Sequence, residues 1–237
     1  MKKIRFMKML EINFLLLWVL LLVCLITESV EAKTMTGYMN KYADKSGQYI
    51  YYVTPAHSLM RYDTKTGDKK KLYSCKAYDS YTHKKDTTNG FLNLTVEGKY
   101  IYLQWTKGYG TSGPDIEETY IYRISKNGKK AQKLAMGANP VIIGNRIYYD
   151  EVKKVYQDNE WWYEETENKM SMKLNGTDKR NEKVTIKVKN RKLGKYQVKA
   201  KFYSSAKEKK NGGLYNSELI LTTPNGKKIS LGTWWTS

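Results

Sequence analysis

The sequence predicts an all-β protein that contains four copies of one antiparallel unit. Two markers recur along the 237 residues at a spacing of about 50 residues. One is a glycine that opens a strand rich in tyrosine and isoleucine, and the other is a turn glycine that precedes basic residues. The opening glycines are Gly47, Gly98, Gly144 and Gly194, and the turn glycines are Gly67, Gly128, Gly176 and Gly226. Composition agrees, because 13% of the residues are aromatic, with 21 Tyr against 4 Pro, which favours sheet.

The hairpin expected over residues 119–134 is the clearest copy of the second marker. An aromatic and β-branched strand leads into Asn127 and Gly128, and a lysine-rich strand follows. Asn-Gly favours a two-residue type I′ turn, because both central residues of that turn need positive φ. The sequence therefore predicts such a turn at this position and comparable hairpins at the other three turn glycines.

The first two units are predicted over residues 33–75 and 91–137. In the first unit the expected strands are 49–53, 59–63 and 69–75, with another supplied from 33–48. In the second unit the expected strands are 91–96 and 99–105 and the two arms of the 119–134 hairpin, with a loop over 107–118. Polar, turn-rich residues 76–90 link the two units.

The last two units are predicted over residues 140–183 and 184–237. In the third unit, strands at 140–143 and 146–152 precede a long loop over 153–168 and a strand at 169–174. In the fourth, strands at 184–188 and 195–203 precede a loop over 204–216 and a closing hairpin. The fourth unit alternates apolar and polar residues, which predicts a sheet with one face in water, as in the terminal repeat of an open array.

Four-stranded antiparallel units repeated at this period are typical of a β-propeller, whose blades pack side by side. The strand 99–105 is apolar on both faces, as expected for a blade that is covered on both sides. We therefore predict an all-β, β-propeller-like array of four four-stranded antiparallel blades. A small closed ring and an open arc that pairs with another chain both remain open.

Residues 147–149 (Ile-Tyr-Tyr) and 173–180 (Lys-Leu-Asn-Gly-Thr-Asp-Lys-Arg) carry a family resemblance, together with residues 49–52 and 61–67. These segments resemble the repeats of bacterial propellers similar to those of low-density-lipoprotein-receptor-related proteins, the YWTD-like propellers. The resemblance implies a secreted or surface-exposed binding module and carries over no catalytic residue. That family is typically six-bladed, so the resemblance does not settle whether four units close a ring.

Residues 1–32 are predicted to be a secretory signal peptide. A basic segment precedes an uncharged run over 14–26, and Val30 and Ala32 fit the small-residue positions of a cleavage site. The run is short for a bilayer span, which needs about 20 apolar residues. Cleavage after Ala32 would make the protein secreted or cell-surface, and an uncleaved membrane anchor is the alternative. The mature chain would then keep a single cysteine, Cys75, and no intrachain disulfide.

Positive charge indicates the class of partner. Lys and Arg total 42 against 23 Asp and Glu, a formal net charge of +19, which favours polyanions. Basic residues follow each turn glycine, so the fold would gather them on one face that binds an anionic cell-wall polymer or a membrane surface. This predicted basic face consists of Lys69, Lys70, Lys129, Lys130, Lys179, Arg180, Lys227 and Lys228. Nucleic acid is disfavoured, because no aromatic residues interleave these side chains to stack bases.

The opposite face would carry the long loops and a second binding surface for a protein or a glycan. The 153–168 loop holds Trp161, Trp162 and Tyr163, and Trp105 and Tyr109 border the neighbouring loop. Aromatic clusters on loops mark contacts with partners. The alternatives are that the three aromatics fold back as a satellite core or an extra strand pair, and that Trp105 belongs to the core.

No residue pattern predicts a catalytic, metal or cofactor site. His57 and His83 are the only histidines and lie in no ligand-like spacing with Cys75. We therefore predict an exported, non-catalytic binding module of the bacterial cell surface or extracellular space, with no cofactor. One alternative is a polysaccharide-acting enzyme that uses loop carboxylates; the candidates are Asp115, Glu117, Glu118, Glu160, Glu164 and Glu165. Another is a structural scaffold that self-associates through the edge of the terminal unit.

Overall fold

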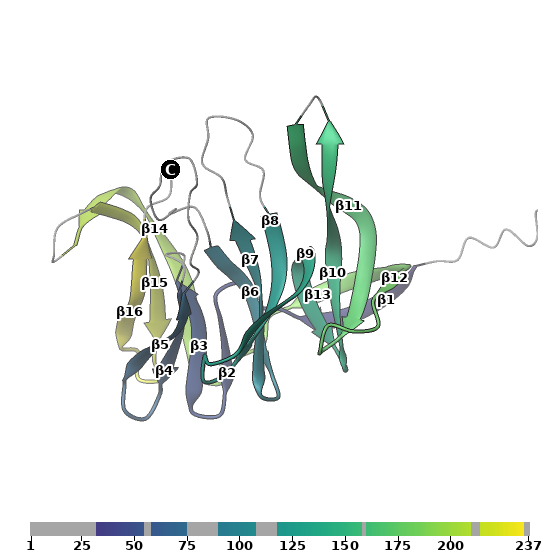
Figure 1. The fold of residues 1–237 in the computed structure, drawn as a ribbon. Helices are drawn as coiled ribbons and strands as arrows, with labels where there is room; N and C mark the ends of the chain where they lie inside the picture. Colours follow the sequence, from purple (N-terminus) through teal and green to yellow (C-terminus); the bar gives the residue numbers. More distant parts are fainter. Residues whose placement is uncertain are drawn as a thin grey trace, which may run out of the picture. The chain divides into compact units, whose positions relative to one another are not determined.

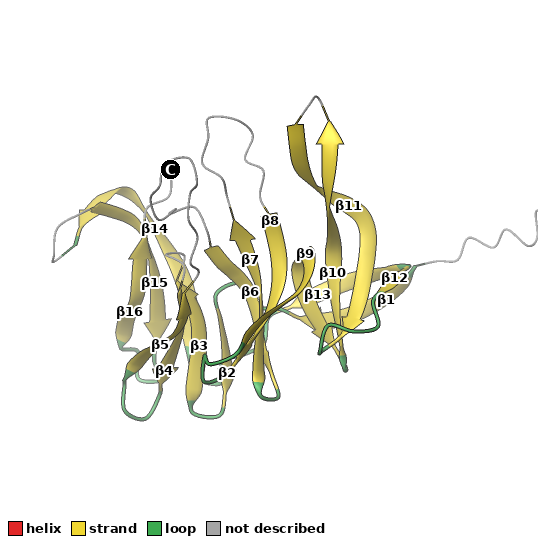
Figure 2. Ribbon diagram, in the orientation of Figure 1, coloured by secondary structure: helices red, strands yellow, loops and turns green. Residues whose placement is uncertain are grey.

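The computed structural model describes residues 32–54, 58–74, 90–107, 118–157, 160–209 and 214–234. Apart from Ala32, the predicted signal peptide lies outside these residues. The described residues form sixteen β-strands and no helix, so the predicted all-β class is confirmed (Figures 1 and 2). Within them there is accordingly no helix of the length and apolar character that a membrane crossing requires.

The strands form three antiparallel sheets. The four-stranded sheet follows chain order: β2 (Ala43–Ser46), β3 (Tyr49–Thr54), β4 (Ser58–Asp63) and β5 (Lys69–Ser74). The three-stranded sheet contains β14 (Gln197–Glu208), β15 (Leu214–Thr222) and β16 (Lys228–Trp234). The nine-stranded sheet contains β6 (Gly90–Glu97), β7 (Tyr100–Lys107), β8 (Glu118–Ser125), β9 (Ala131–Ile143), β10 (Arg146–Gln157), β11 (Glu160–Lys173) and β12 (Arg180–Glu182), with β1 (Lys33–Tyr38) and β13 (Val184–Lys189) beside them.

Strand β9 joins the second and third predicted units into one sheet. Its residues 131–136 pair with β8, and its residues 137–143 pair with β10. Asn139, with a φ of 51°, lies in the second part, where its backbone N–H donates to Gln104 Oε1 over 2.9 Å and its Nδ2 donates to Asp150 Oδ2 over 2.9 Å. The break expected between residues 137 and 140 is therefore absent, because the strand changes partner without leaving the sheet.

The fourth predicted unit contributes three strands to its sheet rather than four. Strand β13 pairs with β1, which in turn pairs with β9, so β13 belongs to the nine-stranded sheet. The turn at Gly194 forms, but only the single bridge between Leu193 and Tyr196 closes it. The chain between β13 and this bridge is instead held by hydrogen bonds from Arg191, described below.

The two sets of glycines make two kinds of turn. Each opening glycine has a φ between 54° and 67°. Gly47, Gly98 and Gly144 are each the first of two residues between paired strands, and Gly194 is the first of two residues between the bridge partners Leu193 and Tyr196. The second residue has no positive φ, which is the pattern of a type II′ turn. The type I′ turn predicted at Asn127 is wrong. Only Gly128 has positive φ, 78°, and Asn127 acts through its side chain, whose Oδ1 accepts the Lys129 N–H over 3.0 Å.

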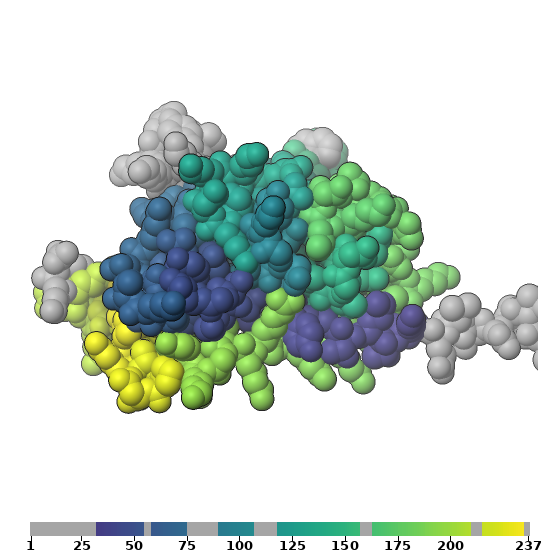
Figure 3. Space-filling model, turned by 90° about the horizontal axis from the view of Figure 1, so that it is seen from below, coloured from purple at the N-terminus to yellow at the C-terminus, as the bar shows by residue number. Residues whose placement is uncertain are grey.

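Buried side chains form three clusters, of which the first two connect neighbouring sheets. In β3, Tyr51 and Val53 face the first cluster, with residues of β6 and β7, whereas Ile50 and Tyr52 face the second, with residues of β15 and β16. The third cluster contains residues of β7, β8, β9, β10 and β11, all within the nine-stranded sheet. Figure 3 shows the yellow C-terminal strands against the blue strands of the four-stranded sheet. None of these clusters, among the residues that the structure describes, joins β14–β16 to β10–β12.

We predict that Gly128→Ala destabilises the fold more than Gly226→Ala does. The two glycines have φ of 78° and 81°, so both alanines would incur the left-handed strain of about 1–2 kcal/mol. A Cβ at Gly128 would also lie 2.2 Å from the Leu72 carbonyl oxygen, whereas one at Gly226 would meet nothing within 4 Å. The clash should lower the free energy of unfolding, measured in urea, by about 1–3 kcal/mol more. Equal losses would contradict the packing of this hairpin against β5.

Candidate functional site

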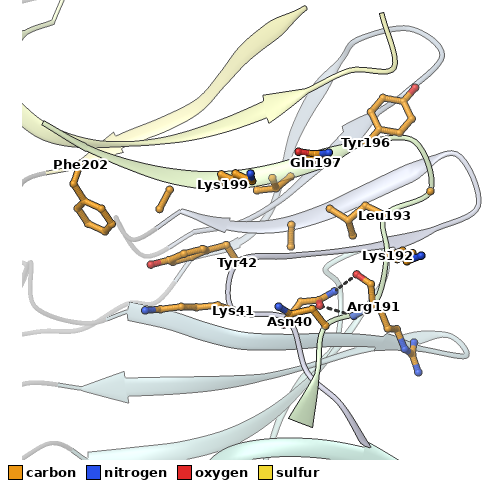
Figure 4. A pocket seen from close by; sticks show the side chains of 15 residues that line it. Asn40, Lys41, Tyr42, Arg191, Lys192, Leu193, Tyr196, Gln197, Lys199 and Phe202 are labelled. Atoms are coloured by element: carbon orange, nitrogen blue, oxygen red, sulfur yellow. Dashed lines mark hydrogen bonds between the residues drawn. The ribbon is translucent and has the colours of Figure 1, made fainter. Parts of the chain in front are cut away.

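A groove of about 710 Å³ lies between the chain that connects β1 to β2, the segment before β14, and β14 itself (Figure 4). We call it the β14 groove. Fifteen residues line it, from 40–43, 190–194, 196–200 and Phe202. Lys41, Arg191, Lys192 and Lys199 supply cationic side chains, and none of the fifteen residues is an aspartate or glutamate. The groove therefore presents an electropositive concavity.

Arg191 fixes one wall of the groove and its charge is already compensated. Its Nη2 lies 2.7 Å from Glu97 Oε2, and its Nη1 donates to the Val96 carbonyl oxygen over 2.7 Å. Asn40 completes the attachment: its Oδ1 accepts the Arg191 backbone N–H over 2.8 Å, and its Nδ2 donates to the Arg191 carbonyl over 3.4 Å (Figure 4). Lys41, Lys192 and Lys199, which form no ion pair with a described carboxylate, are thus left to meet a ligand.

Asp44 supports the same wall from beneath. It is 1% exposed, its Oδ2 accepts the Val96 N–H over 2.8 Å, and its Oδ1 accepts the Lys45 N–H over 2.8 Å. Arg191 Nη1 lies 3.7 Å from Oδ2. Burial raises the pKa of Asp44 above its ordinary value, and the two backbone hydrogen bonds and Arg191 oppose that shift. This carboxylate connects β2, β6 and the groove wall.

Aromatic rings form another part of the rim. Phe202 is 63% exposed, and its ring meets Trp234 edge-on with 6.4 Å between centroids. Trp234 in turn lies 6.5 Å from Tyr42, and Lys41 Nζ lies 5.3 Å from the Tyr42 ring centroid. A ligand in the groove would therefore find apolar ring surface beside the lysines.

Three of the predicted loop-face aromatics lie on a strand and not on a loop. Strands β10 and β11 extend to Gln157 and Glu160, so the loop expected over 153–168 is wrong and the alternative of an extra strand pair describes this segment. Trp161, Trp162 and Tyr163 pair with 156, 155 and 154 in that order. β-Branched and aromatic residues, which favour strands, occur on both arms of this hairpin, as at Val152, Val155 and residues 161–163.

The remaining loop-face residues are distributed over different surroundings. The Tyr163 hydroxyl donates to Glu118 at the start of β8. Trp105 packs against the first buried cluster and meets Tyr122 edge-on with 5.2 Å between centroids, so its core alternative describes it. Tyr109 lies outside the described residues, as do the side chains of Trp161 and Trp162, so no aromatic patch is assembled from the described part of this set.

All eight residues of the predicted basic face are exposed. Each pair lies at the start of β5, β9, β12 or β16, or just before it, at the end of the sheets that carries the short turns (Figure 1). Lys69 Nζ donates to the Ser230 carbonyl over 2.5 Å, and Arg180 pairs with Asp178 over 2.8 Å. The other six form no ion pair with a described carboxylate.

The candidate carboxylates of the enzyme alternative are only partly described. Glu164 and Glu165 are neighbours on β11, so their side chains point to opposite faces. Glu118 accepts the Tyr163 hydrogen bond, while Asp115, Glu117 and the side chain of Glu160 lie outside the described residues. His57, His83 and Cys75 also lie outside them. Among described residues, no three His, Cys, Asp or Glu side chains gather as a metal site would need.

Sequence reasoning missed the β14 groove, although a signal was present. The segment 187–201 contains no Asp or Glu. Its basic residues are Lys187, Lys189, Arg191, Lys192, Lys195, Lys199 and Lys201. What the sequence does not reveal is that residues 40–43, about 150 positions earlier, form the opposite wall.

Comparison with known proteins found no matching family model and no matching curated protein.

We expect Asp44→Ala to lower the free energy of unfolding by about 2–4 kcal/mol, because it leaves the Val96 and Lys45 N–H groups without their acceptor. Asp44→Asn keeps one side-chain oxygen and should lose less. Urea unfolding of the two variants beside the wild type measures both values. Losses below 1 kcal/mol for the alanine variant would show that Asp44 does not hold β2 to β6.

The pH dependence of the same variants gives a second readout. Because burial raises the pKa of Asp44 above 3.8, the Asp44 carboxyl keeps its proton to higher pH in the folded protein than in the unfolded chain. The Asp44 contribution to the free energy of unfolding should therefore fall as pH rises from 3.8 through the folded pKa. The difference between wild type and Asp44→Asn should show this decline, and a constant difference would contradict it.

Proposed function

We propose that this chain is an exported, non-catalytic binding module that takes an anionic ligand in the β14 groove. One observation carries the proposal: four of the fifteen lining residues are cationic and none is acidic. Glu97 and Asp44 compensate Arg191, so Lys41, Lys192 and Lys199 supply the recognition charge. The formal net charge of +19 adds long-range attraction for such a ligand.

We further propose that the sheets are blades of a β-propeller-like array related to the YWTD-like propellers, with an opening between β10–β12 and β14–β16. Several observations support this architecture. The four-stranded sheet β2–β5 is a simple antiparallel meander, and the buried clusters connect it to β6–β7 on one side and to β15–β16 on the other. Strand β9 would act as the outer strand of one blade and the inner strand of the next.

A second proposed function is attachment to a polyanionic surface through the predicted basic face. The observation that favours it is that all eight side chains are exposed while only Arg180 has an acidic partner among the described residues. An anionic cell-wall polymer or a membrane surface would supply the dense negative charge that such a face attracts. The groove would then bind its own ligand while the turn end holds the protein to that surface.

The groove proposal predicts that replacing Lys41, Lys192 and Lys199 weakens the binding of anionic ligands. The probes are hexamers of glutamate, of glycerol phosphate and of a sulfated sugar, titrated by calorimetry at low salt. For the best binder, Lys41→Ala, Lys192→Ala and Lys199→Ala together should weaken binding about tenfold, because exposed ion pairs contribute about 0.5 kcal/mol each. A matched variant with Lys33, Lys183 and Lys187 changed to Ala should bind like the wild type. Equal weakening in both variants, or no binding of any hexamer, would contradict a groove site.

The attachment proposal predicts salt-sensitive retention that depends on the turn end. The protein should sediment with anionic phosphatidylglycerol vesicles, or with beads carrying poly(glycerol phosphate), at about 50 mM salt and be released at about 500 mM, because salt screens exposed charge. Changing Lys70, Lys130 and Lys228 to Ala should reduce retention several-fold, while the Lys33, Lys183 and Lys187 variant should not. Retention that ignores salt or the first variant would refute attachment through this face.

A further inference from the structure

Strand β14 has an open edge beside the groove. It is the terminal strand in the order β14–β15–β16, and among described strands it pairs with β15 alone. On the other side, as far as the described residues extend, the Leu193–Tyr196 bridge just before its first residue is the single backbone pairing. An edge strand presents a row of backbone N–H and C=O groups to which another strand can pair.

The groove follows this edge. Five consecutive residues, 196–200, all line it. Because successive residues of a strand point to opposite faces, a groove reached by both sets borders the edge of the strand and not just one face. A ligand in the groove can therefore reach the backbone of β14 as well as its side chains.

The two faces of β14 next to the groove differ in chemistry. Val198 and Ala200 are partly buried against the second cluster, and Phe202 continues this stripe with its ring 63% exposed. Lys199 and Lys201 are exposed on the other face. In an added strand, each residue lies on the same face as the β14 residue opposite it. Apolar residues would thus lie opposite Ala200 and Phe202, and acidic residues opposite the lysines.

We infer that the β14 groove binds an extended peptide segment of a partner protein, in which acidic and apolar residues alternate over about six positions, by adding it as a strand to the edge of β14. This inference rests on the proposed anionic-ligand function and names its ligand class. Backbone hydrogen bonds along β14 provide the pairing. Lys199 and Lys201 select acidic residues, and Phe202 and Tyr42 provide the apolar contact.

Charge argues against a second copy of this chain as the occupant. Antiparallel pairing of two β14 edges about Ala200 would set Lys199 of one copy against Lys201 of the other, and like charges directly opposite each other are destabilising. Edge lysines are a common protection against such self-pairing. The self-association predicted through the terminal unit is therefore not the use that this edge favours.

The first test uses the full chain and the peptide acetyl-(Glu-Val)₃-amide. It should bind at least tenfold more tightly than a peptide with the same composition arranged as Glu₃-Val₃. An added strand pairs with β14 through alternate amides only. Methylating one alternate set of peptide nitrogens should therefore reduce affinity at least tenfold, and methylating the other set should reduce it much less. Amide hydrogen exchange over 197–202 should slow when the peptide binds.

The second test exchanges the charges. Changing Lys199 and Lys201 to Glu should lower the affinity for the Glu-Val peptide at least tenfold. The same change should raise the affinity for acetyl-(Lys-Val)₃-amide at least tenfold. Lys187→Glu with Lys189→Glu on β13 is the matched control, with the same spacing and the same change in charge, and should keep the wild-type preference. No change of preference in the Lys199 and Lys201 variant would overturn the assignment of these two side chains.

The outcomes separate this inference from the proposed function. If both peptides bind equally and both methylation patterns act alike, strand addition is overturned, while groove-dependent binding of any anionic hexamer still supports the anionic-ligand function. If glycerol phosphate binds the groove and the peptides do not, the ligand is a polymer of another class. If sedimentation shows a dimer whose residues 197–202 are protected without peptide, a second copy occupies the edge. Each of these results would refute the peptide site.

Discussion

Strand β3 is covered on both faces, and the arrangement of the sheets depends on that constraint. Ile50 and Tyr52 pack toward β15 and β16, while Tyr51 and Val53 pack toward β6 and β7. A strand with no polar face exposes a large apolar area unless two neighbouring sheets cover it, at about 25 cal/mol per Å² of buried apolar surface. The four-stranded sheet is therefore stable only between its neighbours. The β14 groove exists because the sheet β14–β16 is held on one of these faces.

Polar interactions then determine the shape of the groove. Asp44 and Arg191 are opposite charges that link β2, β6 and the segment before β14, and each also uses backbone partners. Removing one partner of such a pair costs more than the pair itself contributes, because it leaves a poorly solvated charge. The wall is thus fixed by a few contacts between residues 52 to 151 positions apart, and these contacts hold the segments that carry Lys41 and Lys192.

Local patterns predicted much of the fold from the sequence, and long-range pairing accounts for part of what they missed. Strands such as β3, β7 and β16 follow from alternating β-branched and aromatic residues, and all eight marker glycines have positive φ. The continuity of β9 and the β10–β11 hairpin, which pair strands adjacent in the sequence, were missed because the pattern was interpreted as a break between residues 137 and 140 and as a loop over 153–168. The partner of β13 was not predictable from local patterns, because it depends on the distant strand β1. The groove was missed for the same reason: its basic segment is visible in the sequence, but Asn40 and Tyr42 enter only through the tertiary fold. The turn at Asn127 was misjudged because asparagine is favoured in turns for two reasons: it tolerates positive φ, and its side chain accepts a hydrogen bond from the backbone two residues later. Here the second reason applies.

Because strand β9 is shared, the nine-stranded sheet is expected to unfold more cooperatively than its junction with the sheet β14–β16. Main-chain hydrogen bonds run without interruption from β6 to β12, so the second and third predicted units lose their order together. Among the described strands, the sheet β14–β16 joins its neighbour through side-chain packing and the hydrogen bond from Lys69 Nζ to the Ser230 carbonyl, besides the bridge and hydrogen bonds at its entry. Local opening follows such boundaries, where few main-chain bonds cross. The sheet β14–β16 can therefore separate while the nine-stranded sheet stays intact. The edge of β14 would move with it. The residues proposed to recognise a partner thus belong to the most readily detached part of the protein.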